Sequence, residues 1–147
     1  MVWLITMSVF AADRLTKYVA KGYLRPRGSL PVINGIFHLT YVENRGVAFG
    51  MLQNKGWVFI PVTLGIILGI VYLLSKAKKG SRMLRLPMAM ILGGAIGNLY
   101  DRIFLGYVVD FLDFRIWPVF NLADSSIVIG AVLLGYFIAF KGEALGN

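Results

Sequence analysis

Acidic residues gather in one stretch of this basic, apolar chain. Three of its seven acidic residues, Asp110, Asp113 and Asp124, lie within residues 107–126, and Asp101 lies just upstream. Two carboxyl groups held close together share a proton, so one acts as a base while the other acts as an acid. Such a pair takes a proton from water and protonates the nitrogen that leaves when a peptide bond is cut. The stretch therefore predicts peptide hydrolysis by two aspartates, with no covalent intermediate.

Composition removes most other chemistries. The 147 residues include no cysteine and one histidine, His38, so thiol nucleophiles, disulfides and thiolate metal sites are excluded, and a histidine metal site or a Ser-His-Asp triad is poorly supplied. The net charge of +8 would suit nucleic acid in a soluble protein. However, 58% of the residues are hydrophobic, against roughly 45–50% in soluble domains. Basic residues also flank the apolar runs, which favours a membrane surface. We expect no metal, no cofactor and no nucleic acid.

Four apolar segments are predicted to be transmembrane helices of a single domain, residues 1–147. The second contains twenty uncharged residues, about the number that spans the hydrocarbon of a bilayer. The third has a face of small residues that lets a neighbouring helix approach closely. The loop 76–85 holds five basic residues in ten, as is typical of the cytoplasmic side, so both termini are predicted to be cytoplasmic. The predicted helices cover about residues 1–20, 56–75, 86–104 and 123–140.

The two longer connections are predicted to lie on the outer side of the membrane. In the first, about residues 29–50, polar and apolar residues alternate around 36–41, and Asn34-Gly35 favours a tight turn between strands. The fold class predicted is therefore an all-α membrane four-helix bundle with a small extracytoplasmic antiparallel β-sheet. Every candidate catalytic acid then lies at the outer face.

Polar residues are expected to meet at that face. Asn98 and Arg102 are four residues apart on the third helix and so point the same way. Asp110 ends a strand-like run, while Asn121 and Asp124 lie at the start of the fourth helix. Polar residues placed against lipid are costly and usually functional, so we expect these five at one depth.

The residues alone leave one choice open. Asp110 and Asp113 are three apart, so they point to opposite sides of an extended strand and only one can meet Asp124. Asp124 also suits capping of the fourth helix, a role compatible with catalysis. Asp13 and Lys17, four apart on the first helix, are expected to pair in a supporting role. Asp101 is expected to be a supporting residue too, held by the neighbouring Arg102.

Five blocks of sequence resemble lipoprotein signal peptidase, the bacterial type II signal peptidase. They are AADRLTK at 11–17, ENRGVAFG at 43–50, GGAIGNLYDR at 93–102, VVDFLDF at 108–114 and FNLADSS at 120–126. The resemblance implies a membrane aspartyl endopeptidase that removes signal peptides from prolipoproteins by cutting before the diacylglyceryl-modified cysteine. It implies a bacterial cytoplasmic membrane location, a lipidated prolipoprotein substrate and contact with membrane lipid. A monomer is expected.

The resemblance also assigns roles to residues. The catalytic pair falls on Asp110 and Asp124, which decides against Asp113. Two positions depart from the family pattern, Arg14, where glutamine is commoner, and Val47, where alanine is commoner. The positions that line the substrate site are Asn44, Asn98, Arg102 and Asn121, and those expected to support it are Asp13, Lys17 and Asp101.

The residues alone leave two other functions open. A small proton-coupled transporter would use the acids as a relay, with broken helices or acids at mid-membrane. A non-catalytic lipid-binding or assembly factor would tolerate Asp→Asn changes at both positions.

Overall fold

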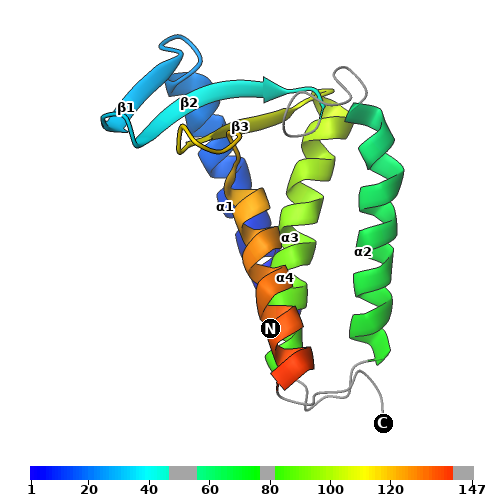
Figure 1. The fold of residues 1–147 in the computed structure, drawn as a ribbon. Coiled ribbons are helices and arrows are strands. Elements are labelled where there is room, and N and C mark those ends of the chain that lie inside the picture. Colours follow the sequence, from blue (N-terminus) through cyan, green and yellow to red (C-terminus); the bar gives the residue numbers. More distant parts are fainter. Residues whose placement is uncertain (47–55, 77–81, 141–147) are drawn as a thin grey trace.

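The computed structural model describes residues 1–46, 56–76 and 82–140. Four helices stand side by side, and a small sheet lies across one of their ends, opposite the N-terminus (Figure 1). The elements in order are α1 (Val2–Tyr23), β1 (Ser29–Ile33), β2 (Phe37–Asn44), the 3-10 turn η2 (Gly56–Val58), α2 (Phe59–Lys76), α3 (Arg82–Phe104), β3 (Val108–Asp113) and α4 (Leu122–Phe140).

Helix α3 contacts the other three helices. The small residues of α3 allow these contacts, because larger side chains at the same positions would collide with the backbone of a neighbouring helix. A Cβ on Gly93 would lie 2.7 Å from the Thr6 carbonyl oxygen on α1, and one on Gly94 would overlap the Ala123 carbonyl oxygen on α4. The close helix approach predicted from these residues is confirmed, and it involves two partner helices.

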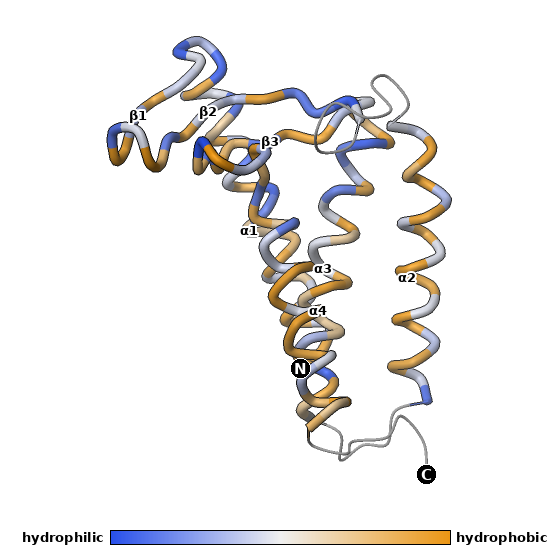
Figure 2. The backbone as a smooth tube through the Cα atoms, in the orientation of Figure 1, coloured by the Kyte–Doolittle hydropathy of each residue, from blue (hydrophilic) through white to orange (hydrophobic). Residues whose placement is uncertain are grey.

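The helices expose many apolar side chains, and between them they bury both an apolar core and several charged residues. Leu68 on α2 and Val132 on α4 are 68% and 66% exposed, whereas Asp13 and Asp101 are fully buried. Figure 2 shows hydrophobic residues running along the helices and hydrophilic ones near the sheet. Two described helical segments, 56–76 and 122–140, are long and apolar enough to cross a membrane. The exposed apolar surface suits surrounding hydrocarbon rather than water.

The sheet is antiparallel with strand order β1-β2-β3. A turn over residues 34–36 joins β1 to β2, and Gly35 adopts φ +73°, a conformation that glycine takes without strain. The tight turn predicted there is confirmed. On β2, the side chains of Leu39 and Tyr41 pack against a buried apolar cluster beside α1. Thr40, which lies between them on the other face, hydrogen-bonds Ser29 and Asp113, so the predicted alternation of apolar and polar residues is confirmed. Val42 on β2 pairs with Asp110 on β3.

Several predicted boundaries were wrong. Helix α1 continues to Tyr23 instead of ending near residue 20, because the helix tolerates Gly22 and the first proline occurs only at position 26. Helix α3 begins at Arg82 instead of 86, and Pro87 lies inside it. The described strands of the first outer segment end at Asn44 instead of residue 50. Residues 47–50 of that segment and 77–81 of the predicted basic loop lie outside the described residues.

Candidate active site

Asp110 and Asp124 reach the same cavity from different elements. Asp110 is the third residue of β3 and is almost fully buried, and Asp124 is the third residue of α4. The cavity has a volume of about 260 Å³, and its wall also includes Asn44 and Arg102. The structure thus brings the predicted pair together, together with two of the four predicted substrate-site residues.

The other two predicted substrate-site residues lie behind the carboxylates. Asn98 Nδ2 donates to Asp124 Oδ1 over 2.7 Å, and Asn121 Nδ2 donates to Asp110 Oδ1 over 2.6 Å. Asn121 Nδ2 also contacts Asn98 Oδ1 at 3.2 Å. Asn44 Nδ2 donates to the second oxygen of Asp110 over 2.9 Å. A continuous chain of side-chain amides therefore links the two carboxylates, and both amides in the middle of it are buried.

The start of α4 fixes part of this chain. Asp124 donates its backbone N–H to Asn121 Oδ1 over 2.9 Å, and Asn121 donates its own to Asp124 Oδ2 over 3.2 Å. This reciprocal arrangement is a capping box, which satisfies two backbone donors at a helix start. The cap is therefore Asn121, whereas the sequence suggested Asp124. The Asp124 side chain is held by the same bonds.

Four charged residues form a compact cluster between α1 and α3, namely Asp13, Arg14, Lys17 and Asp101. Lys17 Nζ contacts Asp13 Oδ2 at 3.1 Å, Asp101 Oδ2 at 2.8 Å and Asn98 Oδ1 at 2.9 Å. These three contacts use the three protons of the ammonium group. The predicted Asp13–Lys17 pair is confirmed. Because Lys17 binds the oxygen of the Asn98 amide, it turns the nitrogen of that amide towards Asp124.

Asp101 is not held by Arg102, contrary to expectation. Its ion pairs are with Arg14 at 2.6 Å and Lys17. The sequence-adjacent side chains point apart because neighbouring residues on a helix lie on different faces. Arg102 instead turns towards the cavity, where its charge acts on both Asp110 and Asp124. Among the described residues, Arg102 Nη1 donates one hydrogen bond, to the carbonyl oxygen of Asn98 on its own helix.

Burial and a like charge act together on Asp110. Removal from water raises the pKa of Asp110, and the nearby charge of Asp124 raises it further, to about 7. Hydrogen bonds from Asn44 and Asn121 offset part of this rise. A carboxyl group with such a pKa holds or releases a proton near neutral pH, as acid–base catalysis requires.

Asp113 lies away from the cavity wall. It accepts hydrogen bonds from Thr40 Oγ1 at 2.8 Å and from the backbone and side chain of Arg115 at 2.8 and 3.0 Å. Burial alone would raise the pKa of Asp113, but these hydrogen bonds outweigh it and leave the pKa below its usual value. Asp113 is thus an ionised residue that holds the turn after β3.

Sequence reasoning missed an apolar groove beside the aspartates. It has a volume of about 610 Å³, and Asp124 lies at its edge. Apolar residues of the β3–α4 connection and of α4 form most of it, namely Phe114, Ile116, Trp117, Phe120, Val128 and Ile129. The sequence signal for this groove was the apolar content of residues 114–120. Such content alone does not distinguish a surface groove from a packed core.

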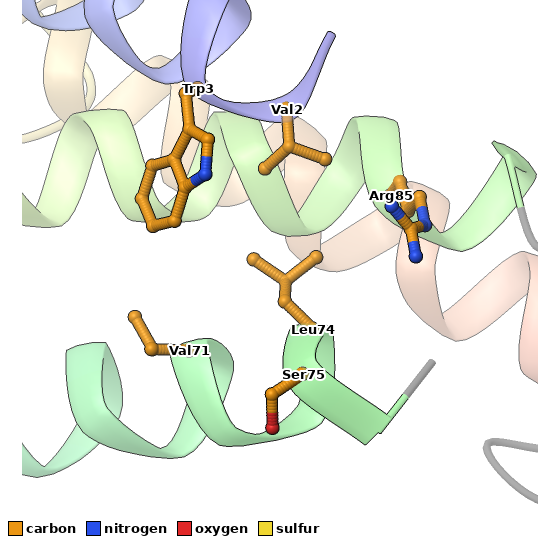
Figure 3. A pocket seen from close by; sticks show the side chains of 6 residues that line it. All are labelled: Val2, Trp3, Val71, Leu74, Ser75 and Arg85. Atoms are coloured by element: carbon orange, nitrogen blue, oxygen red, sulfur yellow. The ribbon is translucent and has the colours of Figure 1, made fainter. Parts of the chain in front are cut away.

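Another cavity lies at the opposite end of the helices (Figure 3). Val2 and Trp3 of α1 line it with Val71, Leu74 and Ser75 of α2 and Arg85 of α3, over about 250 Å³. Among the described residues, no carboxyl group lines this cavity. Within the described ranges, no three His, Asp or Glu side chains are grouped as metal ligands.

The chain is similar to known proteins over almost its whole length. The family model described as signal peptidase (SPase) II matches residues 5–140. The lipoprotein signal peptidase of Caldanaerobacter subterraneus subsp. tengcongensis is 56% identical over 139 residues, covering 94% of this chain and 95% of that protein. The lipoprotein signal peptidase of Halothermothrix orenii is 48% identical over 147 residues, covering all of both chains.

Two solved structures are similar in fold to this chain. A bacterial membrane enzyme solved by the in meso method is similar, with a TM-score of 0.85 and 33% identity, covering 97% of this chain and 88% of that one. A second such structure has a TM-score of 0.85 and 32% identity, covering 95% and 93%. The chain belongs to the signal peptidase II family. The transporter considered from the sequence finds no support in these comparisons.

Proposed function

We propose that this protein is an aspartic endopeptidase of the membrane, in which Asp110 and Asp124 cut the signal peptide from prolipoproteins. Membership of the family supports a peptidase that acts on prolipoproteins. The observation that carries the aspartic mechanism is the shared cavity: both carboxylates line it, and the amides of Asn98 and Asn121 join them from behind.

The proposed reaction uses one proton shared by the pair. The ionised carboxylate takes a proton from water, whose oxygen attacks the scissile carbonyl carbon, while the neutral carboxyl group hydrogen-bonds the carbonyl oxygen. When the carbon–nitrogen bond breaks, the proton passes to the leaving nitrogen. The raised pKa of Asp110 supports a singly protonated pair near neutral pH, and the pair titrates as a unit.

The remaining predicted site residues take three proposed roles. Asn44 and Arg102 line the cavity and are placed to contact the substrate. Asn98 and Asn121 orient the carboxylates, because their amide donors already point at Asp124 and Asp110. Asp13, Lys17 and Asp101 hold these elements from behind.

We further propose that the substrate carries its lipid into the apolar groove. The groove adjoins Asp124, so hydrocarbon lying in it would place a neighbouring peptide bond near the pair. A groove lined by apolar side chains can accept acyl chains from the surrounding bilayer at little cost, which would bring a diacylglyceryl-modified cysteine beside the pair. We propose cleavage before that cysteine, as the family resemblance implies.

The proposed membrane arrangement is a single-domain, monomeric four-helix bundle in the bacterial cytoplasmic membrane. Exposed apolar side chains on all four helices support four spans, although α1 and α3 also carry buried charges. The short basic connection before α3 supports cytoplasmic termini, and with that topology the sheet and the aspartates would lie at the outer face.

A cleavage assay tests the mechanism. Purified wild type, Asp110→Asn and Asp124→Asn are compared on lipidated and unlipidated precursor, with Asp113→Asn as the matched control. We expect both dyad variants to fold and to lose cleavage by at least about a thousandfold, as loss of a catalytic group does. Asp113→Asn should cleave within about tenfold of wild type, because its carboxyl group lies outside the cavity. Undiminished cleavage by either dyad variant would refute the aspartic mechanism, and equal rates on both precursors would refute the lipid role of the groove.

A further inference from the structure

The two buried carboxylates of the charged cluster each hold the backbone next to one member of the aspartate pair. Asp13 Oδ1 accepts the backbone N–H of Ala123 at 3.2 Å, and Ala123 immediately precedes Asp124. Asp101 Oδ2 accepts the backbone N–H of Val109 at 3.2 Å, and Val109 immediately precedes Asp110. The separation of these two carboxylates is therefore linked to the separation of the pair.

One side chain bridges these carboxylates. Arg14 Nη1 donates to Asp101 Oδ1 over 2.6 Å, and Arg14 Nη2 donates to Asp13 Oδ2 over 2.7 Å. The second nitrogen also contacts the carbonyl oxygen of Gly97 at 3.2 Å. Because the guanidinium group is planar and rigid, its two nitrogens define a fixed distance between the acceptors that they bind. The ammonium group of Lys17 contacts the same two carboxylates but imposes no comparable geometry.

The Arg14 side chain is itself held in place. Its guanidinium lies 4.8 Å from the ring centroid of Tyr100 and 5.8 Å from that of Phe10, distances at which cation–π attraction operates. Its side chain is 23% exposed, whereas both carboxylates that it binds are fully buried. Arg14 and Lys17 together balance the two negative charges, so the cluster is neutral.

We propose that Arg14 is a positioning residue that sets the distance between Asp110 and Asp124. The inference rests on the proposed function, because it assumes that these two aspartates form the catalytic pair. Without Arg14, only the ammonium group of Lys17 would join Asp13 and Asp101, and it sets no fixed distance between them. The two carboxylates could then move apart, and the backbone at Ala123 and Val109 would follow. The reactive geometry tolerates little displacement, since an error of about 1 Å can cost a hundredfold in rate.

The pH dependence of cleavage distinguishes positioning from simple charge loss. Two carboxyl groups that interact strongly lose their protons in two well-separated steps, so the width of the pH–rate profile reports their separation. The charged and titratable groups around the Arg14 guanidinium in the described chain are Asp13 and Lys17 on α1 and Asp101 and Tyr100 on α3. Arg102 adds a positive charge beside the pair itself.

The experiment measures kcat and KM against pH on lipidated precursor for the full-length protein in detergent. The variants are Arg14→Lys, which keeps the charge without the rigid bridge, and Arg14→Gln, which removes the charge. Arg27→Gln is the matched control, because the side chain of Arg27 is exposed and contacts only Tyr23 among the described residues. Thermal unfolding of each variant is recorded alongside, and Asp110→Asn and Asp124→Asn are assayed in the same series.

We expect kcat to fall about tenfold to a hundredfold in Arg14→Lys, with KM changed little. The pH–rate profile of Arg14→Lys should become narrower by about one pH unit, and its centre should not shift. Arg14→Gln should show the same narrowing together with a shift of the whole profile to higher pH, because a positive charge is lost. Arg27→Gln should match wild type in kcat and in its pH–rate profile.

Three results would overturn the role of Arg14 while leaving the proposed function intact. The first is a pH–rate profile of Arg14→Gln that shifts without changing its width. The second is a wild-type pH–rate profile for Arg14→Lys. The third is lowered thermal stability with an unchanged pH–rate profile in both variants. Failure of the proposed function looks different, because Asp110→Asn or Asp124→Asn would then cleave normally whatever Arg14 does.

Discussion

Asn121 contacts both aspartates of the pair. Its side-chain nitrogen donates to Asp110 Oδ1 over 2.6 Å, and its backbone N–H donates to Asp124 Oδ2 over 3.2 Å. The same residue caps α4 through its side-chain oxygen. The start of a membrane helix and the geometry of the pair therefore depend on one asparagine.

Replacement of Asn121 separates these two functions. Asn121→Ser keeps a capping oxygen but loses the amide donor to Asp110, so we expect cleavage to fall about tenfold to a hundredfold with little loss of stability. Asn121→Ala loses the cap as well and should be less stable by about 1 kcal/mol than Asn121→Ser. Cleavage rates and thermal unfolding in detergent measure the two effects. Wild-type cleavage by Asn121→Ser would show that the amide donor is dispensable.

Stability should depend on pH through Asp110. Its pKa is raised from 3.8 to about 7, so the folded state binds the proton more tightly than the unfolded state does. This contribution to stability is fully present below pH 3.8 and is lost as the pH rises to about 7. Relative to Asp110→Asn, which does not titrate, the wild type should therefore lose thermal stability across that window. A constant difference between the two proteins from pH 4 to pH 8 would contradict the raised pKa.

The turn after β3 offers a test of backbone strain. Arg115 adopts φ 65°, a conformation that costs a residue with a side chain about 1–2 kcal/mol. Arg115→Gly should therefore unfold at a higher temperature than Arg115→Ala, since both lose the same half-exposed ion pair to Asp113. Equal stability of these two variants would mean that the turn relaxes when the ion pair is lost.

Close packing of α3 against α4 should be sensitive to one methyl group. A Cβ at Gly94 would overlap the carbonyl oxygen of Ala123, and backbone has little freedom to move aside. Gly94→Ala should lose about 1–3 kcal/mol of stability and should also slow cleavage, because Ala123 adjoins Asp124. Gly65→Ala on α2 is the control. It has open space around it and should gain about 0.5–1 kcal/mol. Similar behaviour of the two variants would contradict the tight contact.

The predicted elements largely matched the structure because their signals are local. The uncharged run 56–75 and the Asn34-Gly35 turn depend on neighbouring residues, and both were found. The boundary of α3 was wrong because Pro87 resembles a helix start, whereas the residues before it continue the helix. The cap of α4 was misplaced by three residues because Asn, Asp and Ser all suit that position.

The sequence by itself determined the chemistry available to this protein: aspartates in number, no cysteine, one histidine, and a surface too apolar for water. It also predicted that Asp110 or Asp113 meets Asp124, because so short a connection closes at low entropic cost, but the residues alone did not choose between them. Only the tertiary structure showed that Asp101 pairs with Arg14, 87 residues away, and that Asp13 holds Ala123, 110 residues away. Such partners depend on how helices pack, and packing follows from side-chain shape over the whole molecule rather than from spacing along the chain.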